Sequence, residues 1–239
     1  MNQAISDLFQ LELPQLEARL ARLLGDIMPP DEAARAACKA RWDAVGKPLG
    51  SLGLLETDTQ KIAALTGSAK LDLSARTLLV FCADNGVVAQ GVSQCGNEVT
   101  GFVTRALAEG RSSACTMARV ARCRVQPVDM GVHGLVGEEI PGLVRCRVMD
   151  GTADFTQGPA MTRTQAVEAI AAGIELVRAQ KAQGCQLLAT GEMGIGNTTT
   201  SSAVAAVLLG QPVSLMTGRG AGLSDAGLAR KIAAIETGI

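Results

Sequence analysis

The sequence predicts an α/β protein with a doubly wound, Rossmann-like parallel sheet and a smaller helical lobe. Short apolar runs of strand length alternate with longer segments of helical periodicity, which is typical of right-handed βαβ units. Hydrophobic residues make up 47% of the 239 residues, with four Phe, one Trp and no Tyr. This aliphatic composition, with 27 glycines, suits parallel strands that are covered by helices on both faces.

Residues 1–70 are expected to form the helical lobe. Residues 1 to about 45 have the pattern of two helices, and the first carries one apolar stripe made of Leu16, Leu20, Leu23 and Leu24. The turn segment "KPLGSLGLLE" follows, and Ser51 is expected to cap a third helix that runs to about Leu65.

Residues 71–239 are expected to form the α/β domain. Apolar runs predict strands at 76–84, 124–132, 145–150 and 186–190, the first and fourth of them buried. Helical patterns occupy about 97–121, 163–182, 198–209 and 224–236. Because doubly wound sheets bind ligands at the carboxyl ends of their strands, "CADNG" and "ATGEMGIGNTT" are the candidate functional segments.

Charge and composition argue against several classes of partner. The net charge is -1, basic and acidic residues are interspersed, and aromatic residues are scarce, so we expect no nucleic-acid partner. The seven cysteines form no C-x-x-C pair and His133 is the only histidine, so we expect no metal site. The first residues lack the pattern of a signal peptide, and no apolar run approaches the roughly 20 residues of a membrane span. We therefore expect a cytoplasmic protein with no membrane partner.

The segment "TGEMGIGNTTT" places three glycines and one carboxylate between a strand and a helix. Its glycines permit close backbone approach, and Asn197 or Thr198 is expected to cap the helix. The resulting cluster of N–H groups suits an anionic or polar ligand. The segment matches neither a Walker A loop nor G-x-G-x-x-G, and a purely structural turn remains the alternative.

Glu192 is the informative residue of this turn. Its carboxylate is expected to stay ionised, and it could accept a proton, orient a ribose hydroxyl or offset a developing cation. Phosphate would then bind elsewhere. The segment "TGRGAGLSDAGLARK" offers glycine N–H groups with Arg219 and Lys231, although a solvated surface loop would have the same pattern.

The segment "FCADNGVVAQGVSQCGNEVT" places Asp84 and Asn85 at the end of the first sheet strand. The loop that follows is long enough to line a pocket, and Asp84 either organises this loop or contacts substrate. Catalytic roles for Cys95 and His133 have little support, because the two residues belong to different segments and Cys95 has no evident partner base.

Taken together and in order, these segments resemble the nicotinate-nucleotide:dimethylbenzimidazole phosphoribosyltransferases of cobalamin lower-ligand assembly. The resemblance runs through "KPLGSLGLLE", "FCADNGVVAQGVSQCGNEVT", "VDMGV", "GPAMTRTQA", "TGEMGIGNTTTSSAV" and "GRGAGLSDAGLARK". It implies a homodimer that transfers phosphoribosyl from nicotinate mononucleotide to 5,6-dimethylbenzimidazole or a related base. The products would be α-ribazole 5′-phosphate and nicotinate, and the resemblance implies neither a metal nor another cofactor.

The resemblance also implies roles for individual residues. Glu192 matches the family's active-site glutamate, near the ribose or the incoming base. The residues expected to bind the nucleotide are Gly194, Ile195, Gly196, Asn197, Thr198, Gly218, Arg219, Gly220 and Lys231. Those expected to face the base are Asp84, Asn85, Cys95 and Val103.

Two departures from the family pattern affect these expectations. Family members continue further and carry a second glutamate, taken as the general base, in a glycine-rich segment near the carboxyl end. This chain stops at "IETGI" without that segment, so we expect the chain alone to bind substrate with little or no turnover. Cys95 and Val103 stand where the family's best-known member has polar residues, and the accepted base is therefore not predicted.

Two other functions compete with this interpretation. The first is a noncatalytic subunit that binds nucleotide or base and pairs with a complete homologue. The second is a nicotinamide-dependent oxidoreductase, which we disfavour because "ADNGVVAQG" lacks the G-x-G-x-x-G fingerprint and a ribose-binding acid about 20 residues further on.

Overall fold

The computed structural model describes residues 7–239, which divide into two compact units. One unit consists of Ala18–Ala75, and the other of the described residues up to Glu17 together with Arg76–Ile239. Helix α2 (Leu13–Gly25) runs across the boundary, and the first six positions of the predicted N-terminal helix lie outside the described residues. The apolar stripe predicted there is only partly correct, because Leu16 is buried but Leu24 is exposed.

The helical unit contains α3 (Glu32–Asp43) and α4 (Leu54–Thr66). The prediction that Ser51 caps the next helix is wrong, because α4 begins only after Gly53. Gly50 and Gly53 both adopt positive φ, and these turns carry the chain past Ser51 before the helix starts. The Glu56 carboxylate supports this turn instead, accepting hydrogen bonds from the Leu52 N–H and the Lys47 ammonium group.

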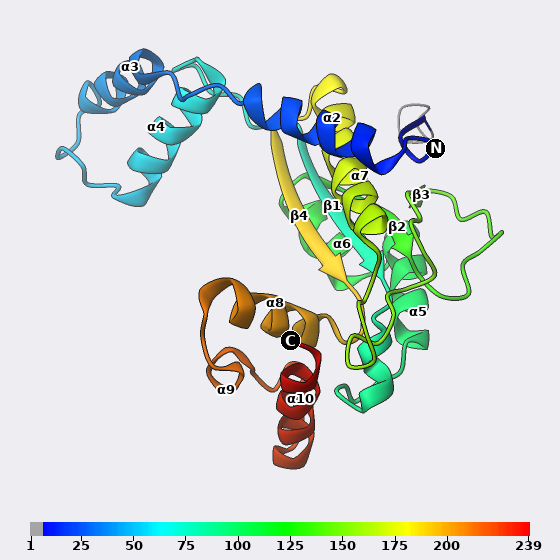
Figure 1. The fold of residues 1–239 in the computed structure, drawn as a ribbon. Helices are drawn as coiled ribbons and strands as arrows, with labels where there is room; N and C mark the ends of the chain where they lie inside the picture. Colours follow the sequence, from blue (N-terminus) through cyan, green and yellow to red (C-terminus); the bar gives the residue numbers. More distant parts are fainter. Residues whose placement is uncertain (1–6) are drawn as a thin grey trace. The chain divides into compact units, whose positions relative to one another are not determined.

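The larger unit is built on a parallel sheet, which confirms the predicted fold class. The strands are β1 (Arg76–Ala83), β2 (Cys123–Gly131), β3 (Val144–Arg145) and β4 (Leu187–Met193). Their order is β3-β2-β1-β4, so the chain winds from β1 in one direction and then returns to place β4 on its other side (Figure 1). The topological switch point therefore lies between the carboxyl ends of β1 and β4, where doubly wound proteins bind ligands.

Alternate residues of β1 face opposite sides of the sheet, as the two-residue period of a strand requires. On one side α7 (Arg163–Ala182) packs through a cluster of Leu79, Val128, Cys146, Ala172 and Leu176. On the other side α5 (Glu98–Ala108) and α6 (Ser113–Val120) pack through Val80, Cys82, Leu107, Cys115, Val132 and Leu135. Figure 1 shows the sheet between these helices.

Three predicted elements differ from the structure. The helix predicted at 97–121 is two helices, because Ser112 caps α6 by accepting the Cys115 N–H. The strand predicted at 145–150 is reduced to the two residues of β3. The fourth strand is not buried, since β4 pairs only with β1 at the edge of the described sheet, and it extends to Met193.

The last helices bring a distant segment back to the sheet. Helix α10 (Asp225–Gly238) packs against α8 (Asn197–Leu209) and α9 (Val213–Met216), and also against the 3-10 helix η1 (Gly86–Gln90). The contacts are two small apolar clusters that share Phe155. This packing places the loop before α10 at the switch point. Within residues 7–239, the structure contains no helix that is both long and apolar enough to cross a membrane.

Candidate functional site

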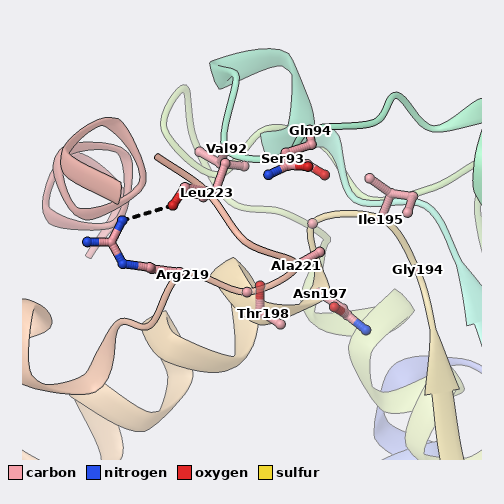
Figure 2. Close-up of a pocket in the computed structure, with 12 residues that line it drawn as sticks. Val92, Ser93, Gln94, Gly194, Ile195, Asn197, Thr198, Arg219, Ala221 and Leu223 are labelled. Carbon is pink, nitrogen blue, oxygen red and sulfur yellow. Dashed lines mark hydrogen bonds between the residues drawn. The ribbon is translucent and has the colours of Figure 1, made fainter. Parts of the chain in front are cut away.

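A pocket lies at the switch point, where three loops meet (Figure 2). The first loop follows η1, the second follows β4, and the third precedes α10. The residues that line the pocket are Val92, Ser93, Gln94, Gly194, Ile195, Gly196, Asn197, Thr198, Arg219, Gly220, Ala221 and Leu223. Two segments that are far apart in the sequence, both expected to bind the nucleotide, therefore share one pocket.

The glycines of the turn after β4 are required by close backbone contacts. A Cβ atom at Gly194 would lie 2.2 Å from the carbonyl oxygen of Ala83, at the end of β1. Gly196 adopts a φ of +88°, and a Cβ there would lie 2.7 Å from a methyl group of Val88. The turn therefore lies directly against β1 and η1, and side chains are sterically excluded at both positions.

The N-terminus of α8 opens toward the pocket. The prediction that Asn197 or Thr198 caps this helix is wrong, because Gly196 occupies the cap position and no side chain caps the helix. Asn197 is the first helical residue, and its side-chain amide donates instead to the Glu192 carboxylate. The N–H groups of Asn197 and Thr199 donate to the carbonyls of Gly194 and Gly196 within the turn. The positive end of the helix dipole at this uncapped start favours an anionic ligand.

Glu192 lies near the end of β4, opposite Phe81 in the register with β1. The residue is exposed, but the protein atoms around its carboxyl group raise its pKa, while the hydrogen bond from Asn197 acts in the opposite direction. A raised pKa makes this carboxylate a better proton acceptor than an ordinary glutamate. The raised pKa differs from the ordinary ionised carboxylate that the sequence predicts at this position.

Lys231 is fully buried on α10 and lies behind the start of α8. Its ammonium group donates to Thr198 Oγ1 at 2.7 Å and to the Gly218 carbonyl at 3.1 Å. Both acceptors are neutral, and no carboxylate of residues 7–239 forms an ion pair with this cation. Burial lowers the pKa of Lys231. A buried cation without a counterion is unfavourable, and a bound anion would relieve that cost. A Cβ at Gly220 would lie 2.8 Å from Thr198 Oγ1, so glycine keeps this space open.

Arg219 is one of the pocket-lining residues, but its guanidinium group is engaged within its own loop. Its guanidinium group donates to the Leu223 carbonyl at 2.9 Å and pairs with Asp225. Figure 2 shows this side chain directed toward Leu223 and away from Asn197 and Thr198. The side chain therefore orders the loop before α10.

The four residues expected to face the base do not gather in this pocket. Asp84 is fully buried, and its Oδ2 accepts the His133 N–H at 2.7 Å. Cys95 is exposed beyond the lining loop, and Val103 packs on α5 against the sheet. Asn85 acts on the pocket through the backbone, since its side-chain amide donates to the Ile195 carbonyl at 3.0 Å.

Sequence reasoning missed several residues that shape the site. Val92, Ser93 and Gln94 were covered only as part of a long loop, although Gln94 donates to the Gly222 carbonyl and so links two walls of the pocket. Thr100 was not singled out, yet it holds the turn after β4. The sequence pattern that could have indicated Thr100 is a hydroxyl residue on the apolar face of a predicted helix, and the same pattern occurs one turn later at Thr104. Among residues 7–239, no group of three or more His, Cys, Asp or Glu could hold a metal ion.

A doubly wound sheet with a glycine-lined pocket at its switch point is the architecture of the class of α/β proteins that bind nucleotides at this place. Residues 27–239 match a family described as "Phosphoribosyltransferase". The chain belongs to this phosphoribosyltransferase family, and the resemblance seen in the sequence is confirmed.

Individual relatives are similar over most of this chain. The nicotinate-nucleotide–dimethylbenzimidazole phosphoribosyltransferase of Roseiflexus sp. (strain RS-1) is 46% identical over 217 residues, which cover 91% of this chain and 61% of the relative. The protein of the same name from Ruminiclostridium cellulolyticum is 44% identical and covers 83% of this chain and 56% of its own length. The CobT protein of Thermus thermophilus, known from a crystal structure, is 41% identical, with a TM-score of 0.81, over 86% of this chain and 61% of that protein. The chain thus spans about three fifths of the length of these relatives.

Proposed function

We propose that this chain takes part in the transfer of phosphoribosyl from nicotinate mononucleotide to 5,6-dimethylbenzimidazole or a related base, as a step of cobalamin biosynthesis. The products are α-ribazole 5′-phosphate and nicotinate. The names of the relatives and the family membership support this reaction.

One observation carries the proposal. A single turn, from Glu192 to Thr198, presents a carboxylate at one end and an uncapped helix start backed by Lys231 at the other. The helix start suits the phosphate of the nucleotide, and the carboxylate suits the part of the ribose where positive charge builds during the reaction. Both features lie at the switch point of the sheet.

The chemistry needs a carboxylate at this place. As the glycosidic bond to nicotinate breaks, the ribose gains oxocarbenium character, and a nearby negative charge stabilises it. The new bond forms to one nitrogen of the incoming base, whose other nitrogen must lose its proton. Glu192 has a raised pKa and is suited to accept this proton or to stabilise the ribose.

We further propose that the chain alone binds nucleotide with little or no turnover. Proton removal and stabilisation of the ribose are two tasks, and the turn from Gly191 to Thr198 carries one carboxylate. The sequence resemblance also leads us to propose a homodimer, which light scattering on the purified chain would test. The seven cysteines are free thiols, which fits a proposed location in the reducing cytoplasm.

Calorimetric titration with nicotinate mononucleotide tests the binding proposal. We expect saturable binding to this chain, with weaker binding of the riboside that lacks phosphate. Turnover is then measured with both substrates, for the chain alone and mixed with the Roseiflexus relative. The absence of nucleotide binding would reject the proposed function, and substantial turnover by the chain alone would reject the proposed inactivity. Stable pairing that changes the relative's activity would favour the noncatalytic subunit instead.

A further inference from the structure

Ile195, in the middle of the glycine turn, has both of its backbone polar groups held by side chains from other segments. Its N–H donates to Thr100 Oγ1 at 3.1 Å, and its carbonyl accepts from Asn85 Nδ2 at 3.0 Å. Thr100 lies on α5 and is fully buried, and Asn85 is the second residue after β1 and is 8% exposed. The turn begins where the pairing of β4 ends, so these side chains take over from the hydrogen bonds of the sheet.

We propose that Thr100 is a positioning residue for nucleotide binding. It fixes the peptide of Ile195 and thereby holds the first turn of α8 at the pocket, including the lining residue Asn197, whose side chain is hydrogen-bonded to the Glu192 carboxylate. The inference rests on the proposed function, because it concerns how the same pocket holds its nucleotide.

The hydrogen bond between Thr100 and Ile195 restrains the turn after β4 on the one side where close backbone contacts do not. The close contacts of Gly194 with Ala83 and of Gly196 with Val88 prevent the turn from moving toward β1 or η1. Thr100 holds the turn from the α5 side, through a contact between residues that are 95 positions apart. With this bond present, backbone contacts or hydrogen bonds to β1, η1 and α5 restrain the turn.

Thr100 also connects two walls of the pocket. Helix α5 begins at Glu98, shortly after the lining residues Val92, Ser93 and Gln94. The same helix holds the turn after β4, which forms the opposite part of the lining. Displacement of either loop is therefore transmitted to the other through Thr100.

The chain provides a matched control on the same helix. Thr104 is also fully buried, one turn further on, but its hydroxyl donates to the Thr100 carbonyl and not to the glycine turn. Thr100→Val and Thr104→Val each replace a buried hydroxyl by a methyl group of similar size. Only the first leaves the Ile195 N–H without its partner. Thr100→Ser keeps the hydroxyl and should restore the bond.

Two measurements test the inference. Hydrogen exchange followed by mass spectrometry should show faster exchange across Ile195–Thr198 in Thr100→Val, and wild-type rates in Thr104→Val and Thr100→Ser. Calorimetric titration should show nicotinate mononucleotide binding weakened by about tenfold or more in Thr100→Val, equivalent to about 1.4 kcal/mol, with Thr100→Ser close to wild type.

The outcomes separate the two proposals. Equal loss of affinity in both valine variants would overturn the positioning role, because general loosening of α5 would then explain the effect. Unchanged exchange of the turn in Thr100→Val would also overturn it. If the wild-type chain binds no nucleotide, the proposed function fails and the role in nucleotide binding fails with it, while the exchange data still decide whether Thr100 holds the turn.

Discussion

Replacement of Lys231 by methionine should separate recognition of the phosphate from recognition of the rest of the nucleotide. Methionine preserves most of the buried volume and removes the charge. In the structure this ammonium group has two neutral acceptors, Thr198 Oγ1 and the Gly218 carbonyl, and it lies beside the uncapped start of α8. A hydrogen bond between charged groups contributes about 1.5–3 kcal/mol, so we expect affinity for nicotinate mononucleotide to fall roughly 10- to 100-fold.

The comparison ligand is the riboside that lacks phosphate. Its affinity should be nearly unchanged in Lys231→Met, because the lost interaction involves only the phosphate. Calorimetric titration of both ligands gives the ratio of affinities directly. Lys181→Met removes one charge from an exposed position on α7 and should leave both affinities as in wild type.

The same variant changes how stability depends on pH. Burial lowers the pKa of Lys231 in the native state below its ordinary value of 10.5. Between the native and the ordinary pKa the unfolded chain binds more protons, so this residue makes wild-type stability rise with pH in that window. The rise should be absent in Lys231→Met, as measured by urea unfolding. Equal losses of nucleotide and riboside affinity, or a pH dependence of stability like that of wild type, would refute the assignment of Lys231 as a buried cation that binds the phosphate.

Three further predictions concern the turn and its neighbours. The pKa of Glu192 is raised above its ordinary value of 4.5, so above pH 4.5 the native state binds more protons than the unfolded chain. The contribution of this residue to stability is fully present below pH 4.5 and is lost as pH rises through the native pKa. Relative to wild type, the stability of Glu192→Gln in urea unfolding should therefore increase as pH is raised from 4 to 8, and the variant should still bind nucleotide. A stability difference that stays constant across this range would contradict the desolvation of the carboxyl group. Gly194→Ala should destabilise the protein by about 1–3 kcal/mol, because its Cβ would overlap the Ala83 carbonyl. The control Gly173→Ala lies on α7, where a Cβ would have no atom within 4 Å, and it should be neutral or stabilising. Thermal unfolding that finds Gly173→Ala less stable than Gly194→Ala would refute the contact. Gln94→Ala removes the hydrogen bond to Gly222 across the pocket and should speed nucleotide release by roughly 2- to 10-fold with little change in melting temperature; stopped-flow release at the wild-type rate would show that this bond does not close the pocket.

The sequence predicted much of the fold because its signals are local. Apolar runs and helical periodicity located β1, β2 and α7 to within about a residue, since these elements are framed by turns and caps such as the capping box of Thr162 and Gln165. The predictions failed where tertiary contacts decide the outcome. The chain leaves strand geometry after Arg145, and β4 lies at an edge of the sheet, which no local pattern distinguishes from a buried strand.

The candidate site shows the same division. Glycine spacing and the single carboxylate indicated the turn around Glu192, and collinear motifs indicated the family. Sequence reasoning could not show that Arg219 turns toward Asp225, that Lys231 is buried without a counterion, or that Val103 packs against the sheet. Those properties depend on neighbours that are distant in the chain.

The sequence by itself determined that this protein is a doubly wound α/β relative of the phosphoribosyltransferases, because strand and helix periods, glycine turns and the order of the motifs are properties of neighbouring residues in the sequence. Only the tertiary structure decided how the site is held together. The packing of α10 against α8 and η1 brings Lys231 to Thr198, and the approach of α5 brings Thr100 to Ile195. Hydrogen bonds act over about 3 Å, so which groups meet is set by the packing of whole helices and not by the residues themselves.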